Sequence, residues 1–160
     1  MSIAPARVET TVNGAPRTLT VEPQELLLDT LRDRLGLRGA KRSCDVQVCG
    51  TCTVLVDGEP VSACTYLTVE AEGREVLTIE GFAEQDEFAE FERAFVERAA
   101  LQCGFCTPGL VLTLKALRDA GELSDPEAVA AGLDGSVCRC TGYRAILEAV
   151  DDLAGTGSAR

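Results

Sequence analysis

Eight cysteines are the residues of this sequence whose type and spacing are best suited to chemistry. The sequence contains no histidine, so a site built from soft metal ligands must consist of thiolates alone. Four thiolates are what a [2Fe–2S] cluster requires, and the cysteines fall into two groups of four, which indicates a protein that carries electrons. We call them the N-terminal set, Cys44, Cys49, Cys52 and Cys64, and the C-terminal set, Cys103, Cys106, Cys138 and Cys140.

The N-terminal set has the spacing C-x₄-C-x₂-C…C, which is typical of plant-type [2Fe–2S] ferredoxins. A loop with three thiolates must curl around a cluster so that its backbone N–H groups point at the sulfurs, and Gly50 permits close backbone approach. A four-cysteine zinc site usually consists of two closely spaced cysteine pairs. Here three cysteines lie close together and the fourth, Cys64, stands alone, so the spacing disfavours zinc. The N-terminal set is therefore predicted to bind a plant-type cluster.

The C-terminal set consists of a C-x₂-C pair and a C-x-C pair. The C-x-C spacing is too short for a typical zinc-ribbon pair, so spacing alone favours iron–sulfur but leaves zinc open. Thr107-Pro108 follows the first pair and Thr141-Gly142 follows the second, and each resembles an N-cap or a first helical turn. Both pairs are then expected at helix N-termini, where the helix dipole favours negative charge.

Composition limits what the chain can be. Its 160 residues, 46% of them hydrophobic, suffice for one ordinary domain or two small ones. No apolar run approaches the roughly 20 residues that span a bilayer, and the first residues lack the apolar stretch of a secretory signal. We therefore expect a cytoplasmic protein, in which structural disulfides are disfavoured. The formal net charge of −11 argues against nucleic-acid binding and indicates a solvated surface or docking to basic partners.

The first eighty residues are predicted to be mostly strand. Alternating residues over 7–12, a turn at Asn13-Gly14 and a second strand form one hairpin. A helix is expected to begin at Pro23 and to stop at Gly36, followed by an ordered loop to residue 52. A second hairpin turns at Asp57-Gly58, and a last strand covers 75–79. These elements resemble a β-grasp sheet.

The second half is predicted to be helical. Four amphipathic patterns are expected to form a small four-helix bundle, and the fold class is therefore α+β. The change of character places a ferredoxin-like domain at 1–80 and a helical domain at 81–160. The helices are marked by Phe88, Phe91 and Phe95; by Leu110, Leu114 and Leu117; by a capped start at Ser124-Asp125-Pro126; and by Ile146, Val150 and Leu153.

Several motifs extend beyond the cysteines themselves. The segments 102–109 (QCGFCTPG) and 138–143 (CRCTGY) are the longest, joined by Leu31-Arg32, 39–41 and 49–53. With them the chain resembles, from about Arg7 to Leu153, the iron–sulfur subunits of the molybdenum hydroxylases, the xanthine oxidase family. The resemblance implies one [2Fe–2S] cluster in each domain, with molybdopterin and FAD on separate chains or domains.

The resemblance also implies roles for individual residues. The N-terminal set would ligate the cluster that faces the flavin, and the C-terminal set the cluster nearer molybdenum. Gln102 would hydrogen-bond the pterin, although a solvated side chain is the alternative, and Cys140 would lie closest to the pterin ring. Phe105 is expected to shield the cluster and to fill the bundle core, and Tyr143 to serve packing. Ser43 and Gly135-Ser136 depart from the common family pattern of Gly and Gly-Asn without removing a ligand.

The expected function is electron relay from molybdenum through the C-terminal cluster and the N-terminal cluster to FAD, or to a cytochrome in its place. The expected partners are a large molybdopterin-binding subunit and a medium FAD-binding subunit, arranged as a dimer of heterotrimers. No catalytic residue is expected on this chain, and its substrate class stays open among carbon monoxide, aldehydes, purines and N-heterocycles. The alternatives are a free two-cluster ferredoxin and a zinc-stabilised adaptor.

Overall fold

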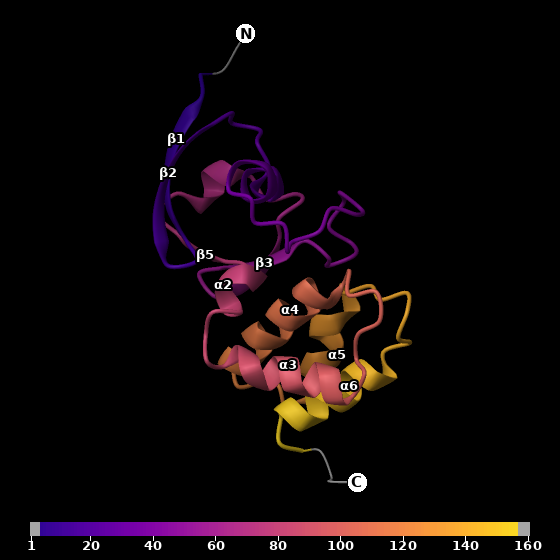
Figure 1. The fold of residues 1–160 in the computed structure, drawn as a ribbon. Helices are drawn as coiled ribbons and strands as arrows, with labels where there is room; N and C mark the ends of the chain where they lie inside the picture. The colour runs from indigo at the N-terminus through magenta and orange to yellow at the C-terminus, as the bar shows by residue number, and fades with distance from the viewer. Residues whose placement is uncertain (1–3, 157–160) are drawn as a thin grey trace.

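A five-stranded sheet and a group of helices form the two halves of the chain in the computed structural model, which describes residues 4–156 (Figure 1). The strand order is β2-β1-β5-β3-β4. The β1 and β5 strands run parallel, and the other neighbouring strands pair antiparallel, as in a β-grasp sheet. The strands are β1 (Ala6–Val12), β2 (Ala15–Val21), β3 (Thr53–Val56), β4 (Glu59–Ser62) and β5 (Glu75–Leu77).

Both predicted hairpins are confirmed, and their turns explain why they form. Asn13 and Gly14 adopt positive φ angles of 52° and 73° between β1 and β2. Asp57 and Gly58 do the same between β3 and β4, with φ of 51° and 85°. Consecutive left-handed residues match the right-handed twist of two paired strands, and Asn-Gly and Asp-Gly adopt that conformation at little cost.

The helix that packs against the sheet begins later than predicted. It starts at Leu27 (α1, Leu27–Asp29) and continues as a π-helical turn over Thr30–Arg34, whereas we expected a start at Pro23. The residues after Pro23 instead form a turn closed by the Glu25 amide, which donates to the Glu22 carbonyl at 2.9 Å. The predicted strand over 75–79 is also shorter, because β5 ends at Leu77 and α2 (Ile79–Phe82) follows directly.

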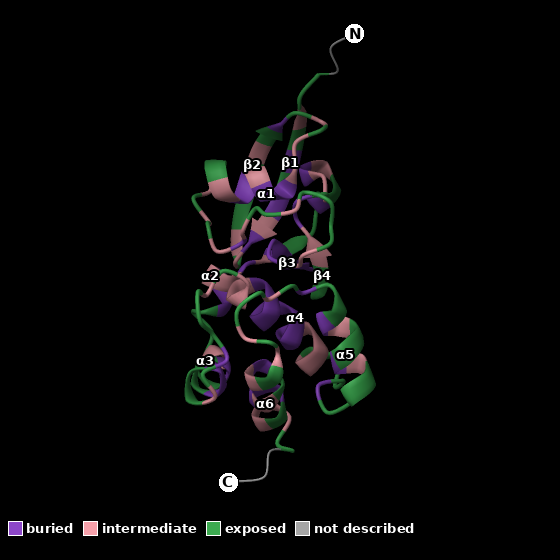
Figure 2. Cartoon of the chain, turned by 90° about the vertical axis from the view of Figure 1, so that its right-hand side faces the viewer, coloured by how far each residue is buried: buried purple, intermediate pink, exposed green. Residues whose placement is uncertain are grey.

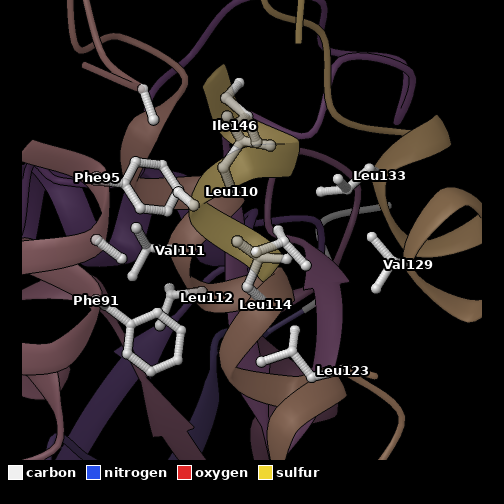
Figure 3. Packing of buried hydrophobic residues seen from close by; sticks show 14 of the residues in the cluster. Phe91, Phe95, Leu110, Val111, Leu112, Leu114, Leu123, Val129, Leu133 and Ile146 are labelled. Carbon is white, nitrogen blue, oxygen red and sulfur yellow. The ribbon is translucent and has the colours of Figure 1, made fainter. Parts of the chain in front are cut away.

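The four predicted helices of the second half are present, and α4 is the central one (Figure 1). Every residue of α4 from Gly109 to Lys115 is buried, because α2, α5, β3 and β4 contact it and residues of α3 and α6 share its core (Figure 2). Phenylalanines from α3 and leucines from α4 fill the space between these helices (Figure 3). The helices are α3 (Phe88–Glu97), α4 (Thr107–Asp119), α5 (Pro126–Asp134) and α6 (Arg144–Leu153).

The hydrophobic cores of the two halves meet at β3. One core lies between α1 and the sheet, and it includes Leu28, Leu31 and Val54. The other lies among the helices, yet it also contains Leu55 of β3. Side chains alternate across a strand, so β3 contributes one face to each core, and Figure 2 shows it buried directly beside α4. Within residues 4–156, no helix has the length and apolar character needed to cross a membrane.

Candidate iron–sulfur sites

The loop before β3 carries three cysteines and has an unusual backbone. Asp45 and Gln47 adopt positive φ angles of 55° and 58°, a conformation that non-glycine residues rarely take, and Gly50 follows with 67°. These reversals curl the loop, and the Lys41 amide closes it by donating to the Thr51 carbonyl at 2.9 Å. The curled loop predicted from the spacing is therefore present.

The sulfurs of the N-terminal set lie in two pairs, Cys44 with Cys49 and Cys52 with Cys64. The backbone amides of Val46 and Val48 lower the pKa of the Cys44 thiol to about 6, and the Val48 amide donates to its sulfur at 3.4 Å. Burial raises the pKa of the Cys52 thiol to about 12, and the neighbouring Cys64 thiol adds to the rise. In the Cys44–Cys49 pair, loop amides thus stabilise the Cys44 thiolate, whereas Cys52 and Cys64 are buried in the fold.

The C-terminal set is assembled from two segments far apart in the sequence. Cys106 is the N-cap residue of α4, with Pro108 in the first turn, as predicted. Its thiol pairs with that of Cys138. The Cys103 and Cys140 sulfurs lie 3.6 Å apart, although 37 positions separate these residues in the chain. The second set therefore also consists of two pairs, each joining one segment to the other.

The two thiols of the Cys106–Cys138 pair have pKa values shifted in opposite directions. Burial raises the pKa of the Cys106 thiol to about 12, with the Cys138 thiol adding to the effect. Partial burial acts in the same direction at Cys138, but hydrogen bonds from the side chain and backbone of Thr141 outweigh it and lower that pKa to about 7. The adjacent Cys103 thiol raises the pKa of Cys140.

The paired arrangement fits a two-iron cluster. A [2Fe–2S] cluster takes four thiolates, two on each iron, so thiols that meet in pairs within one set suit it. Both sets have this form, so their donor chemistry and their grouping fit one such cluster each.

The second cysteine pair does not lie at a helix N-terminus, contrary to the prediction. Helix α6 begins at Arg144, and its N-cap is Tyr143 in the left-handed conformation, with φ of 67°. Gly142 is also left-handed, so two reversed residues separate Cys140 from the helix. Thr141 does not cap α6 either, since its hydroxyl contacts the Cys138 sulfur at 3.1 Å and accepts from the Tyr143 amide at 3.2 Å.

Phe105 does not fill the bundle core as expected. It is 44% exposed, because it lies in the loop before α4 rather than on the helix. It lines a cavity of about 320 Å³ together with all four cysteines of the C-terminal set and with Cys49 of the N-terminal set. Gln102 is exposed and directly precedes Cys103, which lines this cavity.

The sequence reasoning missed a direct backbone contact between the two sets. The Val137 amide, next to Cys138, donates to the Cys49 carbonyl at 2.9 Å. Two glycines allow the approach. A Cβ on Gly109 would lie 2.1 Å from the Gly50 carbonyl oxygen, and one on Gly50 would lie 2.4 Å from the carbonyl oxygen of Gly135. The sequence contains these glycines, but no pattern in it predicts that the two loops that carry them come into contact.

Comparison with known proteins agrees with this geometry. Residues 10–80 match the family described as 2Fe-2S iron-sulfur cluster binding domain, and residues 78–151 match the [2Fe-2S] binding domain family. The chain is 44% identical to the 6-hydroxypseudooxynicotine dehydrogenase complex subunit beta of Paenarthrobacter nicotinovorans, over 91% of this chain and 92% of the relative. It is 40% identical to the xanthine dehydrogenase iron-sulfur-binding subunit of Escherichia coli O157:H7, over 91% and 92%. The chain belongs to the iron–sulfur subunits of the xanthine oxidase family of molybdenum hydroxylases.

A solved structure extends the agreement to three dimensions. This iron–sulfur subunit superimposes on a chain of quinoline 2-oxidoreductase from Pseudomonas putida 86 with a TM-score of 0.87 and 38% identity, covering 96% of this chain and 95% of that one. The ferredoxin-like and helical parts of the fold are thereby confirmed. The relatives are subunits of larger oxidoreductases, so electron transfer within a multi-subunit complex is supported over the free two-cluster carrier.

Proposed function

We propose that this iron–sulfur subunit relays electrons from a molybdopterin centre on a large subunit to FAD on a medium subunit. A [2Fe–2S] cluster, when bound, takes up and gives back one electron at a time. The protein supplies position and electrostatics. The observation that carries the proposal is the hydrogen bond from the Val137 amide to the Cys49 carbonyl, because it joins the two cysteine sets directly, backbone to backbone.

We propose the eight cysteines as the ligands, with one cluster in domain 1–80 and one in domain 81–160. Their grouping into four thiol pairs supports this assignment. Gln102 and Cys140 would be the residues nearest the pterin. Both are exposed, and Cys140 contacts Cys103, which directly follows Gln102 in the chain, so the two can face one partner surface.

Exposed apolar residues surround both sets and support docking to larger partners. Val46 and Val48, 64% and 60% exposed, lie on the loop of the N-terminal set. Leu101, Phe105 and Val137 lie around the C-terminal set and are 39 to 48% exposed. Large apolar side chains left in solvent around a site commonly mark an interface. We propose the medium subunit at the first group and the large subunit at the second, in a cytoplasmic dimer of heterotrimers.

The test is to purify the native complex and to analyse its metals and spectra. We expect co-elution with a large molybdenum-containing chain, and about four irons and about four sulfides per copy of this chain, because each of two clusters holds two of each. Reduction should produce two distinct EPR signals. A lone brown 17 kDa protein would support the free carrier instead, and a colourless protein containing zinc would overturn both readings.

A further inference from the structure

Tyr143 makes two hydrogen bonds that packing alone does not require. Its phenol accepts from the Cys138 amide at 2.8 Å and donates to the Ser136 carbonyl at 3.0 Å. The ring meanwhile packs against the helical core. One side chain therefore holds the backbone on both sides of Val137.

The backbone amide of Val137, which lies between these two contacts, points toward the N-terminal set. The Tyr143 phenol hydrogen-bonds the Ser136 carbonyl and the Cys138 amide. The Val137 amide between them points away from the phenol and donates to the Cys49 carbonyl. The phenol and the Cys49 carbonyl thus hold the segment from opposite sides.

The backbone of Tyr143 is itself in an unfavourable conformation. Its φ is 67°, in the left-handed region, which a bulky residue rarely adopts. Such outliers persist only where the surroundings hold them, and they cluster at functional sites. The Thr141 hydroxyl accepts from the Tyr143 amide at 3.2 Å and also contacts the Cys138 sulfur, so this conformation is coupled to the cysteine.

We propose that Tyr143 is a positioning residue for electron transfer between the two sites. Its phenol keeps the Val137 amide aimed at the Cys49 carbonyl and thereby fixes the contact through which the C-terminal set meets the N-terminal set. Passage of one electron oxidises one site and reduces the other by one, so charge balances and no proton has to move. This inference rests on the proposed relay.

Tyr143→Phe in the intact complex tests the proposal, because it removes both hydrogen bonds and keeps the ring. We expect the Val137 amide to exchange with deuterium about thirtyfold faster, the factor that corresponds to losing two net hydrogen bonds of about 1 kcal/mol each. In the fully reduced complex, the magnetic interaction between the two EPR signals should weaken, and electron transfer between the sites should slow. Iron content should stay at the wild-type value.

The chain offers a matched control in its other tyrosine. Tyr66 donates its phenol hydrogen bond to the Glu70 carbonyl at 3.1 Å, away from residues 136–138. Tyr66→Phe should therefore leave the Val137 exchange rate and the EPR interaction unchanged. Val137→Pro supplies a second route, since it deletes the amide donor while Tyr143 stays. It should reproduce the weakened EPR interaction.

The outcomes separate this proposal from the relay on which it rests. If Tyr143→Phe lowers the melting temperature but leaves the amide exchange and the EPR interaction as in wild type, Tyr143 has only a packing role and the inference is overturned. The same holds if Val137→Pro leaves the interaction intact. If the wild-type complex itself lacks two clusters, the proposed function fails instead.

Discussion

The two cysteine sets are built in different ways. Three cysteines of the N-terminal set lie within one loop, residues 44–52, and amides of that same loop donate to the Cys44 sulfur. The C-terminal set joins two segments 37 positions apart at Cys103 and Cys140, which meet only because α4, α5 and α6 pack together. The first site is therefore encoded locally, whereas the second depends on tertiary structure.

The two sets also differ in how far their cysteines are buried. Cys52 and Cys64 are 2% and 3% exposed, because they lie against the core of the sheet. Cys103 and Cys140 are exposed, and no element within residues 4–156 covers them. The N-terminal site is thus enclosed partly by its own domain, while the C-terminal site opens at the surface that the large subunit is proposed to cover.

Replacing one cysteine of each set gives the largest expected effect. Cys138→Ser should eliminate one of the two reduced-state EPR signals and about half of the iron, since each cluster needs its four thiolates. The ferredoxin-like signal should remain, because the N-terminal loop does not need the helices to assemble its cysteines. EPR and iron analysis of the purified complex measure both quantities.

Cys52→Ser is the reciprocal variant. It should remove the ferredoxin-like signal and leave the other. Loss of both signals in either variant would contradict the independence of the two sites. The N-terminal loop would then need the helical half to assemble its cluster.

Leu55 tests whether the two halves are separate stability units. It belongs to the sheet but lies in the helical core, 2% exposed. Leu55→Ala should destabilise the chain by about 2–5 kcal/mol, the cost of a large-to-small change in a packed core. Thermal unfolding followed by circular dichroism should show the helical half melting earlier, although the substitution is in a strand.

Leu147→Ala is the comparison variant, because Leu147 is 45% exposed on α6. Its effect should stay within about 0.5 kcal/mol, as for surface positions. If Leu55→Ala has an equally small effect, β3 does not couple the two cores.

The difference between the sets also explains what could be predicted from sequence. Local signals sufficed for both hairpins, for the curled loop of the N-terminal set and for the Cys106 helix start. They failed where a distant contact decides the conformation. The left-handed backbone of Tyr143 displaces the start of α6, and the exposed Phe105 lies before its helix rather than on it. Likewise, the pairing of Gly50 with Gly109 requires two chain segments to be placed first.

The glycine contact between the halves can be broken directly. A Cβ at residue 109 would lie 2.1 Å from the Gly50 carbonyl oxygen, which is backbone and cannot rotate away. Gly109→Ala should therefore cost about 1–3 kcal/mol through overpacking. It should also weaken the EPR interaction between the sites, because the two loops must separate.

Gly132→Ala is the matched control on α5. Its Cβ would meet the tip of the flexible Leu117 side chain at 2.9 Å, which can move aside. The EPR interaction should then be unchanged. Equal effects of the two substitutions would show that the Gly50–Gly109 contact has no special role in holding the sites together.

The smallest effect is expected at the start of α5, the helix that leads into the C-terminal set. The Asp125 side chain accepts a hydrogen bond from the Glu127 amide at 2.9 Å and caps this helix. Asp125→Ala should cost about 1 kcal/mol, whereas Asp125→Asn keeps a capping oxygen and should cost much less. Because the Ser136 amide donates to the Leu133 carbonyl at the end of α5, fraying should reach the segment that carries Cys138. Hydrogen exchange should then rise in 126–138 and stay unchanged in 44–52. A rise in both segments would mean that the two sites share one cooperative unit, and that their difference lies in how they are assembled rather than in how they are maintained.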